Sequence, residues 1–162
     1  MHLFFALISA AACGCLGVLF ARRAAERYRL ARAWEAALER MESAVLAGES
    51  LQRILLTGSG GQIPLLGSAA ETLRRQPALT VEAWLAALPR EPLLQQEEYD
   101  LLAACLRGLF SPHMESQMRA LRFCRDRWQA VVRRCGEESE KNGRLYGRLG
   151  WLGGAALFIL MC

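Results

Sequence analysis

The sequence begins with an apolar stretch, LFFALISAAACGCLGVLFA at residues 3–21, that contains no charged side chain. As an α-helix this stretch would be about 28 Å long, close to the roughly 30 Å hydrocarbon core of a bilayer. Basic residues follow it, beginning with Arg22 and Arg23, and none precedes it. A cleaved signal peptide would instead carry its basic residues before the apolar run. The pattern therefore favours a retained N-terminal transmembrane anchor over residues 1–21.

A second uncharged stretch, LGWLGGAALFILMC, occupies residues 149–162. As a helix it would be only about 21 Å long, so a crossing would extend back toward Leu145, with Arg148 reaching the headgroups. A buried core helix is the alternative for an apolar run of this length. Gly150 and Gly154 have the spacing of closely packed membrane helices. We therefore predict a C-terminal transmembrane helix over residues 149–162.

The charged residues all lie between these two stretches: 20 Lys and Arg, 16 Asp and Glu, for a net charge of +4. Basic residues flank both stretches on their inner sides, at Arg22 and Arg148 for example. Positive flanks of membrane spans face the cytosol. We expect residues 22–148 to form a cytosolic domain and both termini to lie outside the cytosol. The cytosolic membrane leaflet is a sufficient partner for this mild charge, so nucleic acid is not needed to explain it.

Helical periodicity governs residues 22–148, and no strand-like alternation extends beyond a few residues. Two apolar stripes mark two long helices that we expect to lie side by side. The first stripe comprises Ala24, Tyr28, Ala31, Trp34, Leu38, Met41 and Val45. The second comprises Met114, Met118, Leu121, Trp128, Val132 and Cys135. The predicted fold class is all-α, with a bundle of about five to six helices between two transmembrane helices.

Turn and capping residues divide the middle of the domain. Gly48 is expected to end the first long helix, and residues 58–61, GSGG, to form a loop. That loop lacks the Lys-Ser/Thr pair of a phosphate-binding loop. We expect short helices over residues 51–56, 65–75, 81–88 and 95–106. The expected N-caps are Ser50, Thr80 and Ser111, with Pro112 as the first residue of the last helix.

Residues that carry catalytic or metal chemistry are sparse. His113 is the only histidine between residues 22 and 148, and no CxxC motif occurs. We therefore predict a protein that is not an enzyme, with no cofactor and no metal site. Six cysteines are predicted to be small apolar residues, those of the middle domain buried and reduced. They are Cys13, Cys15, Cys105, Cys124, Cys135 and Cys162.

A basic run lies on the last long helix, within residues 119–134. Its arginines are Arg119, Arg122, Arg125, Arg133 and Arg134. A solvated helix face is the simplest interpretation, and docking to an acidic partner is the next. A nucleic-acid surface would need aromatic side chains among the arginines, and the tryptophans are expected in the core instead.

Residues 140–153, EKNGRLYGRLGWLG, resemble the C-terminal segment of the stage III sporulation protein AB family, which has the pattern E-K-N-G-x-x-Y-x-x-L-G before its last helix. Residues 41–50, MESAVLAGES, resemble the family's L-E-x-E-I-x-Y-G-x-T segment. Here Ala44 and Ala47 depart from the usual acid and aromatic residue, and Leu51 from the usual proline. The matching positions are Glu42, Gly48, Glu140, Asn142, Gly143, Tyr146 and Gly150.

The resemblance implies a non-enzymatic adaptor in the transenvelope complex between mother cell and forespore. The family is similar to the cytosolic domain of the platform proteins of type II secretion and type IV pilus machines. It implies a place in the outer forespore membrane of the mother cell, with other complex subunits and the cytosolic ATPase as partners. A homo-oligomer is compatible with this role. The alternative function is a membrane-tethered regulator that binds nucleic acid or a signalling protein through residues 119–134.

Overall fold

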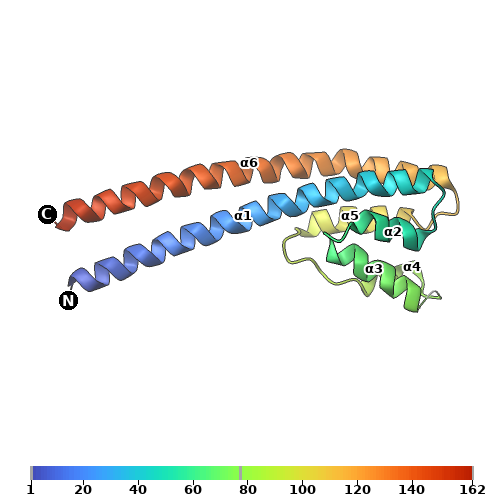
Figure 1. Ribbon diagram of the computed structural model, residues 1–162, viewed down its shortest axis with the longest axis horizontal. Coiled ribbons are helices and arrows are strands. Elements are labelled where there is room, and N and C mark those ends of the chain that lie inside the picture. Colours follow the sequence, from blue (N-terminus) through green and yellow to red (C-terminus); the bar gives the residue numbers. More distant parts are fainter. Residues whose placement is uncertain (1, 77, 162) are drawn as a thin grey trace. The chain divides into compact units, whose positions relative to one another are not determined.

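A computed structural model describes the backbone of residues 2–76 and 78–161, and the side chains of residue 19, residues 21–76 and residues 78–142. Every regular element in these residues is a helix, which confirms the all-α class (Figure 1). The helices are α1 (His2–Leu46), α2 (Leu51–Ser59), α3 (Pro64–Arg75), α4 (Val81–Ala86), α5 (Gln96–Gly108) and α6 (Met114–Met161).

The chain divides into two compact units, and the two long helices contribute a segment to each. One unit comprises Met1–Tyr28 and Arg133–Cys162, and we call it the terminal unit. The other comprises Arg29–Val132, and we call it the bundle unit. The bundle unit contains all four short helices together with the end of α1 and the beginning of α6.

In the bundle unit the segments of α1 and α6 lie side by side, as the two stripes predict. Trp128 on α6 donates its indole N–H to the backbone carbonyl of Ala31 on α1, at 2.8 Å. The same indole packs against Trp34, with ring centroids 6.1 Å apart and the rings tilted by 55°. Both tryptophans are almost completely buried. An aromatic pair of this kind contributes about 0.5–1.5 kcal/mol beyond the burial of its apolar area.

Each short helix of the bundle unit packs against the next one in the sequence. On α4, Trp84 is buried and donates its indole N–H to the carbonyl of Ala69 on α3. On α5, Arg107 pairs with Glu82 of α4 at 2.8 Å. Helices α2 and α3 pack against each other. Each short helix has 6 to 13 residues, too few for stability alone, so packing holds it in place.

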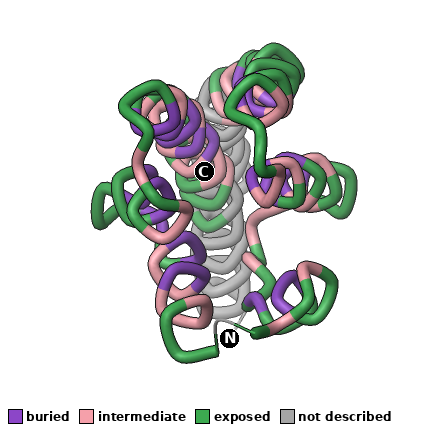
Figure 2. Tube along the Cα trace, turned by 90° about the vertical axis from the view of Figure 1, so that its right-hand side faces the viewer, coloured by how far each residue is buried: buried purple, intermediate pink, exposed green. Residues whose placement is uncertain are grey.

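Most members of the two predicted stripes are buried, including Leu38 on α1 and Leu121 on α6, neither of which is exposed at all. Three members are not buried. Ala24 and Tyr28 are half-buried on α1, and Met114 is half exposed in the first turn of α6. Figure 2 shows buried and exposed residues alternating along the helices, as expected for amphipathic elements.

The prediction that Gly48 ends the first long helix is confirmed. Its φ of +72° is left-handed, and its N–H donates to the carbonyl of Val45. The next N–H, from Glu49, donates to the carbonyl of Ala44. These two bonds define the Schellman motif, which satisfies carbonyls left open at a helix end.

The predicted loop over residues 58–61 is wrong at its first two positions. Gly58 and Ser59 form the last turn of α2 and are buried. A Cβ atom at Gly58 would lie 2.5 Å from Cγ of Met41, so the glycine lets α1 approach the helix closely. Arg40 also donates to the Gly58 carbonyl at 2.8 Å, which satisfies a carbonyl of the last turn. The loop itself begins at Gly60, which has a left-handed φ of +49°.

Two of the predicted caps differ from the structure. Thr80 caps α4 as expected, because its hydroxyl accepts from the N–H of Ala83, although α4 ends at Ala86 rather than at residue 88. Ser50 occupies the N-cap position of α2 without a capping side-chain hydrogen bond. Ser111 does not cap the last helix, because its hydroxyl accepts from the nearby N–H of His113.

The beginning of α6 is consequently displaced from the predicted position. The helix begins at Met114, two residues after Pro112. The side-chain amide of Gln117 donates to the carbonyls of Leu109 and Ser111, at 2.9 and 2.8 Å. These bonds hold the connection between α5 and α6 in a non-helical conformation, which sequence periodicity does not reveal.

In the terminal unit, α1 and α6 are again neighbours. Arg27 pairs with Glu138 at 3.3 Å. The ring of Tyr28 lies against Gly136, so that a Cβ atom there would be 3.2 Å from Cε2 of the ring. Among the residues with described side chains, no helix is long and apolar enough to cross a membrane. The predicted spans over residues 3–21 and 149–162 lie outside those residues, apart from positions 19 and 21, and stay predictions.

Helices α5 and α6 approach each other closely at Gly108, and this contact gives a stability prediction. A Cβ atom at Gly108 would collide with Cβ of Ala120. We expect Gly108→Ala to lower the free energy of unfolding by about 1–3 kcal/mol, the usual cost of overpacking. Urea unfolding of the purified chain, followed by circular dichroism, measures it.

The matched control is Gly67→Ala on α3, where the nearest atom to a new Cβ is the Ser59 hydroxyl at 3.8 Å. This substitution should be neutral or stabilising by up to about 1 kcal/mol, because alanine favours helix more than glycine does. Equal effects of the two substitutions would contradict a close approach at Gly108.

Candidate functional site

Two of the predicted site residues meet in the bundle unit: Glu42 on α1 and Arg125 on α6. Nη1 of Arg125 donates to Oε2 of Glu42 at 2.6 Å. The side chain of Glu42 is 13% exposed and that of Arg125 is 31% exposed, so water screens this ion pair only partly. The pair joins the two long helices across 83 positions of sequence.

Arg125 is therefore half-buried and paired with Glu42, whereas the other arginines of the predicted basic face are exposed. Arg125 follows Leu121 by four positions and precedes Trp128 by three, and both of these residues are completely buried. Residues three or four apart share a face of a helix, so Arg125 lies at the edge of the buried stripe. This spacing is a signal in the sequence that could have separated Arg125 from the other arginines.

A pair of buried cysteines lies close to the Glu42 carboxylate. Cys105 on α5 and Cys124 on α6 are both buried and free. A hydrogen bond with Cys124 raises the pKa of the Cys105 thiol well above its ordinary range, and burial and the charge of Glu42 raise it further. The thiol therefore stays protonated at neutral pH. Cys135 is also buried, whereas the other three cysteines lie outside the described side chains.

The two oxygens of the Glu42 carboxylate differ in their contacts. Oε1 is buried and receives no hydrogen bond from the part of the chain whose side chains are described, whereas Oε2 accepts the bond from Arg125. Burying a carboxylate oxygen without a hydrogen-bond partner costs free energy. The burial of Glu42 therefore depends on its ion pair with Arg125. The family-matching acid Glu42 thus has a structural explanation: it ties α1 to α6.

The other family-matching positions are spread over the chain. Gly48 is the left-handed glycine at the end of α1, and a Cβ atom there would meet nothing within 4 Å. Glu140 is exposed and Asn142 is half-buried on the terminal-unit part of α6. The last three positions have a helical backbone within α6, and their side chains lie outside the described residues. They are Gly143, Tyr146 and Gly150.

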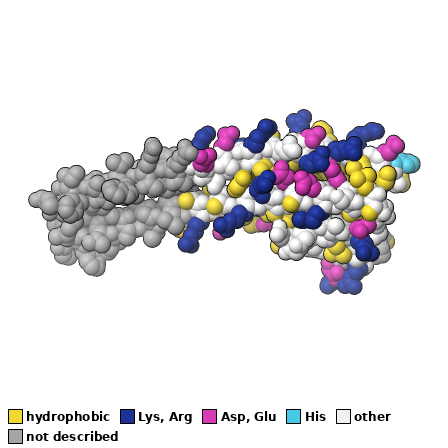
Figure 3. Space-filling model, turned by 45° about the horizontal axis from the view of Figure 1, so that its top comes forward, with side chains coloured by type: hydrophobic (Ala, Val, Ile, Leu, Met, Phe, Trp, Pro, Cys, Tyr) yellow, Lys and Arg dark blue, Asp and Glu magenta, His cyan; other side chains and the backbone are white. Residues whose placement is uncertain are grey.

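The remaining basic-face arginines are exposed but do not form one described site. Arg119 and Arg122 belong to the bundle unit, whereas Arg133 and Arg134 belong to the terminal unit. On the face shown in Figure 3, basic and acidic side chains are interspersed rather than gathered by sign. Arg127, which the sequence did not single out, lies over the ring of Phe123 at 5.5 Å from its centroid.

The structure adds a surface feature that sequence reasoning missed, an open groove between α5 and α6 with a volume of about 350 Å³. Its walls are mostly apolar, and one charged side chain, Arg119, contributes to them. Phe123 on its edge is 57% exposed. The lining residues are Leu101, Ala104, Cys105, Ser116, Arg119, Ala120, Phe123 and Cys124.

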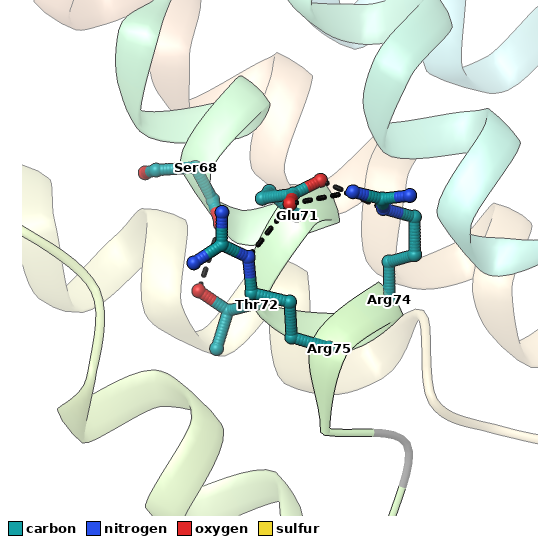
Figure 4. Close-up of polar contacts among 5 residues, drawn as sticks. All are labelled: Ser68, Glu71, Thr72, Arg74 and Arg75. Atoms are coloured by element: carbon teal, nitrogen blue, oxygen red, sulfur yellow. Dashed lines mark hydrogen bonds and ion pairs between the residues drawn. The ribbon is translucent and has the colours of Figure 1, made fainter.

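A second charged cluster, formed by Glu71, Arg74 and Arg75, lies at the C-terminal end of α3 (Figure 4). Glu71 accepts hydrogen bonds from Arg74 at 2.8 Å and from Arg75 at 2.7 Å. The bonds from Arg74, followed by those from Arg75, lower the pKa of the Glu71 carboxyl from 4.5 to about 2. The two arginines lie at the C-terminal end of the helix, where positive charge is favourable. The cluster is exposed, and its i,i+3 and i,i+4 ion pairs support the last turn of α3.

Among the residues with described side chains, no three His, Cys, Asp or Glu side chains gather where they could hold a metal ion. The predictions that the protein is not an enzyme and binds no cofactor stay predictions.

Together the fold and these residues define a helical-bundle protein in which two long helices are tied by aromatic and charged contacts. The chain belongs to the stage III sporulation protein AB family, whose sequence model matches residues 2–162. The resemblance seen at residues 41–50 and 140–153 is thereby confirmed, and the protein has a role in stage III of sporulation. Neither the curated proteins nor the solved structures compared with this chain gave a significant match.

The contact between Glu42 and Arg125 predicts a measurable coupling between the two side chains. In a double-mutant cycle of Glu42→Ala and Arg125→Ala, we expect a coupling energy of about 1–3 kcal/mol, because the pair is largely removed from water. The measurement is urea unfolding of the two single variants and the double variant.

The chain offers an exposed pair as the control for this cycle. Glu82 and Arg107 are 71% and 51% exposed, with an interatomic distance of 2.8 Å. Their coupling should stay below about 1 kcal/mol, as is usual for surface pairs. Couplings of equal size in the two cycles would show that burial does not strengthen the Glu42–Arg125 pair.

Proposed function

We propose that this protein is a non-enzymatic, membrane-anchored adaptor of the stage III sporulation complex. Its bundle unit docks other subunits of the complex, including the cytosolic ATPase, to the outer forespore membrane of the mother cell. The observation that carries the proposal is the family match over residues 2–162. The two uncharged ends of the sequence, which have the composition of membrane spans, support the anchoring.

The contacts inside the bundle unit fit an adaptor. Glu42, which matches the family pattern, is engaged in an ion pair between α1 and α6, and Gly48 ends α1. These residues fix the shape of the bundle, and a bundle of fixed shape presents its surface without a large entropic cost on binding. The residues available to partners are the exposed ones, such as Arg119 and Arg122 on α6.

The alternative, a regulator that binds nucleic acid or a signalling protein through residues 119–134, has less support. Arg125 is engaged with Glu42, and the exposed acids Glu115 and Asp126 lie among the exposed arginines of α6. A nucleic-acid surface depends on several unopposed positive charges that contact phosphates. We therefore expect this protein to bind other proteins and not nucleic acid.

Co-purification tests the adaptor role. A tagged full-length chain, isolated from sporulating cells after gentle solubilisation, should bring down the ATPase and membrane subunits of the stage III complex. An untagged strain is the control for non-specific recovery. Recovery of the tagged chain with none of these subunits would count against the proposal.

Reporter fusions test the proposed topology. A reporter placed before Met1 or after Cys162 should read as non-cytosolic, because basic residues flank both uncharged ends on their inner sides. A fusion inserted after Gly61, in the turn that follows α2, should read as cytosolic and is the internal control. A cytosolic reading at the C-terminus would mean that residues 149–162 do not cross the membrane.

A further inference from the structure

The groove between α5 and α6 has an exposed aromatic residue on its edge. Phe123 is 57% exposed, although its neighbours Leu121 and Cys124 on the same helix are buried. The guanidinium of Arg127 lies over the ring, 5.5 Å from its centroid, in a cation–π contact. Aromatic residues held in place next to an apolar hollow are typical of the anchor positions of protein interfaces.

The groove itself is formed by small side chains. Helices α5 and α6 come together at Gly108 and Ala120. Beside this point the walls carry Ala104 and Ser116, which leave a hollow of about 350 Å³. Its apolar walls favour apolar side chains as occupants.

The charge of the groove determines what kind of segment can enter. Arg119 is the one charged residue that lines it, and Arg122 follows one helical turn later on the exposed surface. Neither arginine forms an ion pair with the part of the chain that the structure describes. The acids Glu115 and Asp126 are exposed on the same helix but do not line the groove. An incoming carboxylate therefore finds a free guanidinium beside an apolar surface.

We propose that this groove is the docking site for an amphipathic segment of a partner protein, in which an acidic residue lies next to apolar side chains. The apolar side chains fill the hollow beside Phe123, and the carboxylate pairs with Arg119. The inference rests on the proposed adaptor function and specifies which face of the bundle unit carries it out.

Site-specific photo-crosslinking in the full-length chain tests the proposal. Benzoylphenylalanine replaces Phe123 in one variant and Leu56 in the other, and Leu56 is a similarly exposed apolar residue on α2. After irradiation of sporulating cells, mass spectrometry identifies the crosslinked peptide. We expect position 123, and not position 56, to capture a stage III subunit through a peptide with an acidic residue beside apolar ones.

Charge reversal is the second arm of the test. Arg119→Glu should reduce the crosslink at position 123 at least tenfold, whereas Arg119→Lys should retain most of it. Arg90→Glu reverses an exposed arginine outside the groove and should change nothing. Circular dichroism of each variant shows whether the fold is retained.

The outcomes separate this proposal from the adaptor function. A crosslink to a second copy of this chain, to lipid, or to a peptide without acidic residues would overturn the docking proposal. Capture of the subunit at position 56 and not at position 123 would also overturn the docking proposal. That result would leave the adaptor function standing. If no stage III subunit co-purifies with any variant or with the unmodified chain, the adaptor function itself fails.

Discussion

The bundle unit depends on the pairing of its two long helices, which Trp128 secures. The indole donates to the carbonyl of Ala31 and packs on Trp34, so one side chain provides both a polar and an apolar contact between α6 and α1. The Glu42–Arg125 ion pair adds a charged contact between the same helices. The four short helices are too short to be stable alone, and they fold on the surface that this pair provides. Disruption of the pairing would therefore affect the entire bundle unit rather than one helix.

Periodicity and single-residue rules predicted much of this fold. The two apolar stripes, the cap at Thr80 and the helix end at Gly48 follow from local chemistry, which one sequence contains. Features that depend on distant partners were not predictable in the same way. The lack of space for a side chain at Gly58 depends on Met41 of another helix, and the role of Arg125 depends on an acid 83 positions away. The groove is a property of two helices together, so no segment of either helix reveals it.

Within the bundle unit, the family-matching residue Glu42 and the exposed residues around the groove occupy different places. Glu42 is largely buried and holds two helices together, so its replacement would change the shape of the bundle before it changed any surface. Arg119 and Phe123 lie outside the family-matching segments and are exposed. Under the proposed adaptor function, the buried contacts would keep the framework of the bundle, whereas the exposed surface could differ with the partner.

The position of Trp128 in the sequence also has a consequence for synthesis of the chain. The tryptophan lies 97 positions after Ala31, so the buried face of α1 leaves the ribosome long before its partner helix exists. At usual elongation rates of about 5–20 residues per second, that interval is about 5–20 s. During this time Trp34 and Leu38, which are completely or almost completely buried in the finished protein, have no helix α6 to cover them. The nascent chain therefore presents this apolar face of α1 without its partner helix until translation passes residue 128.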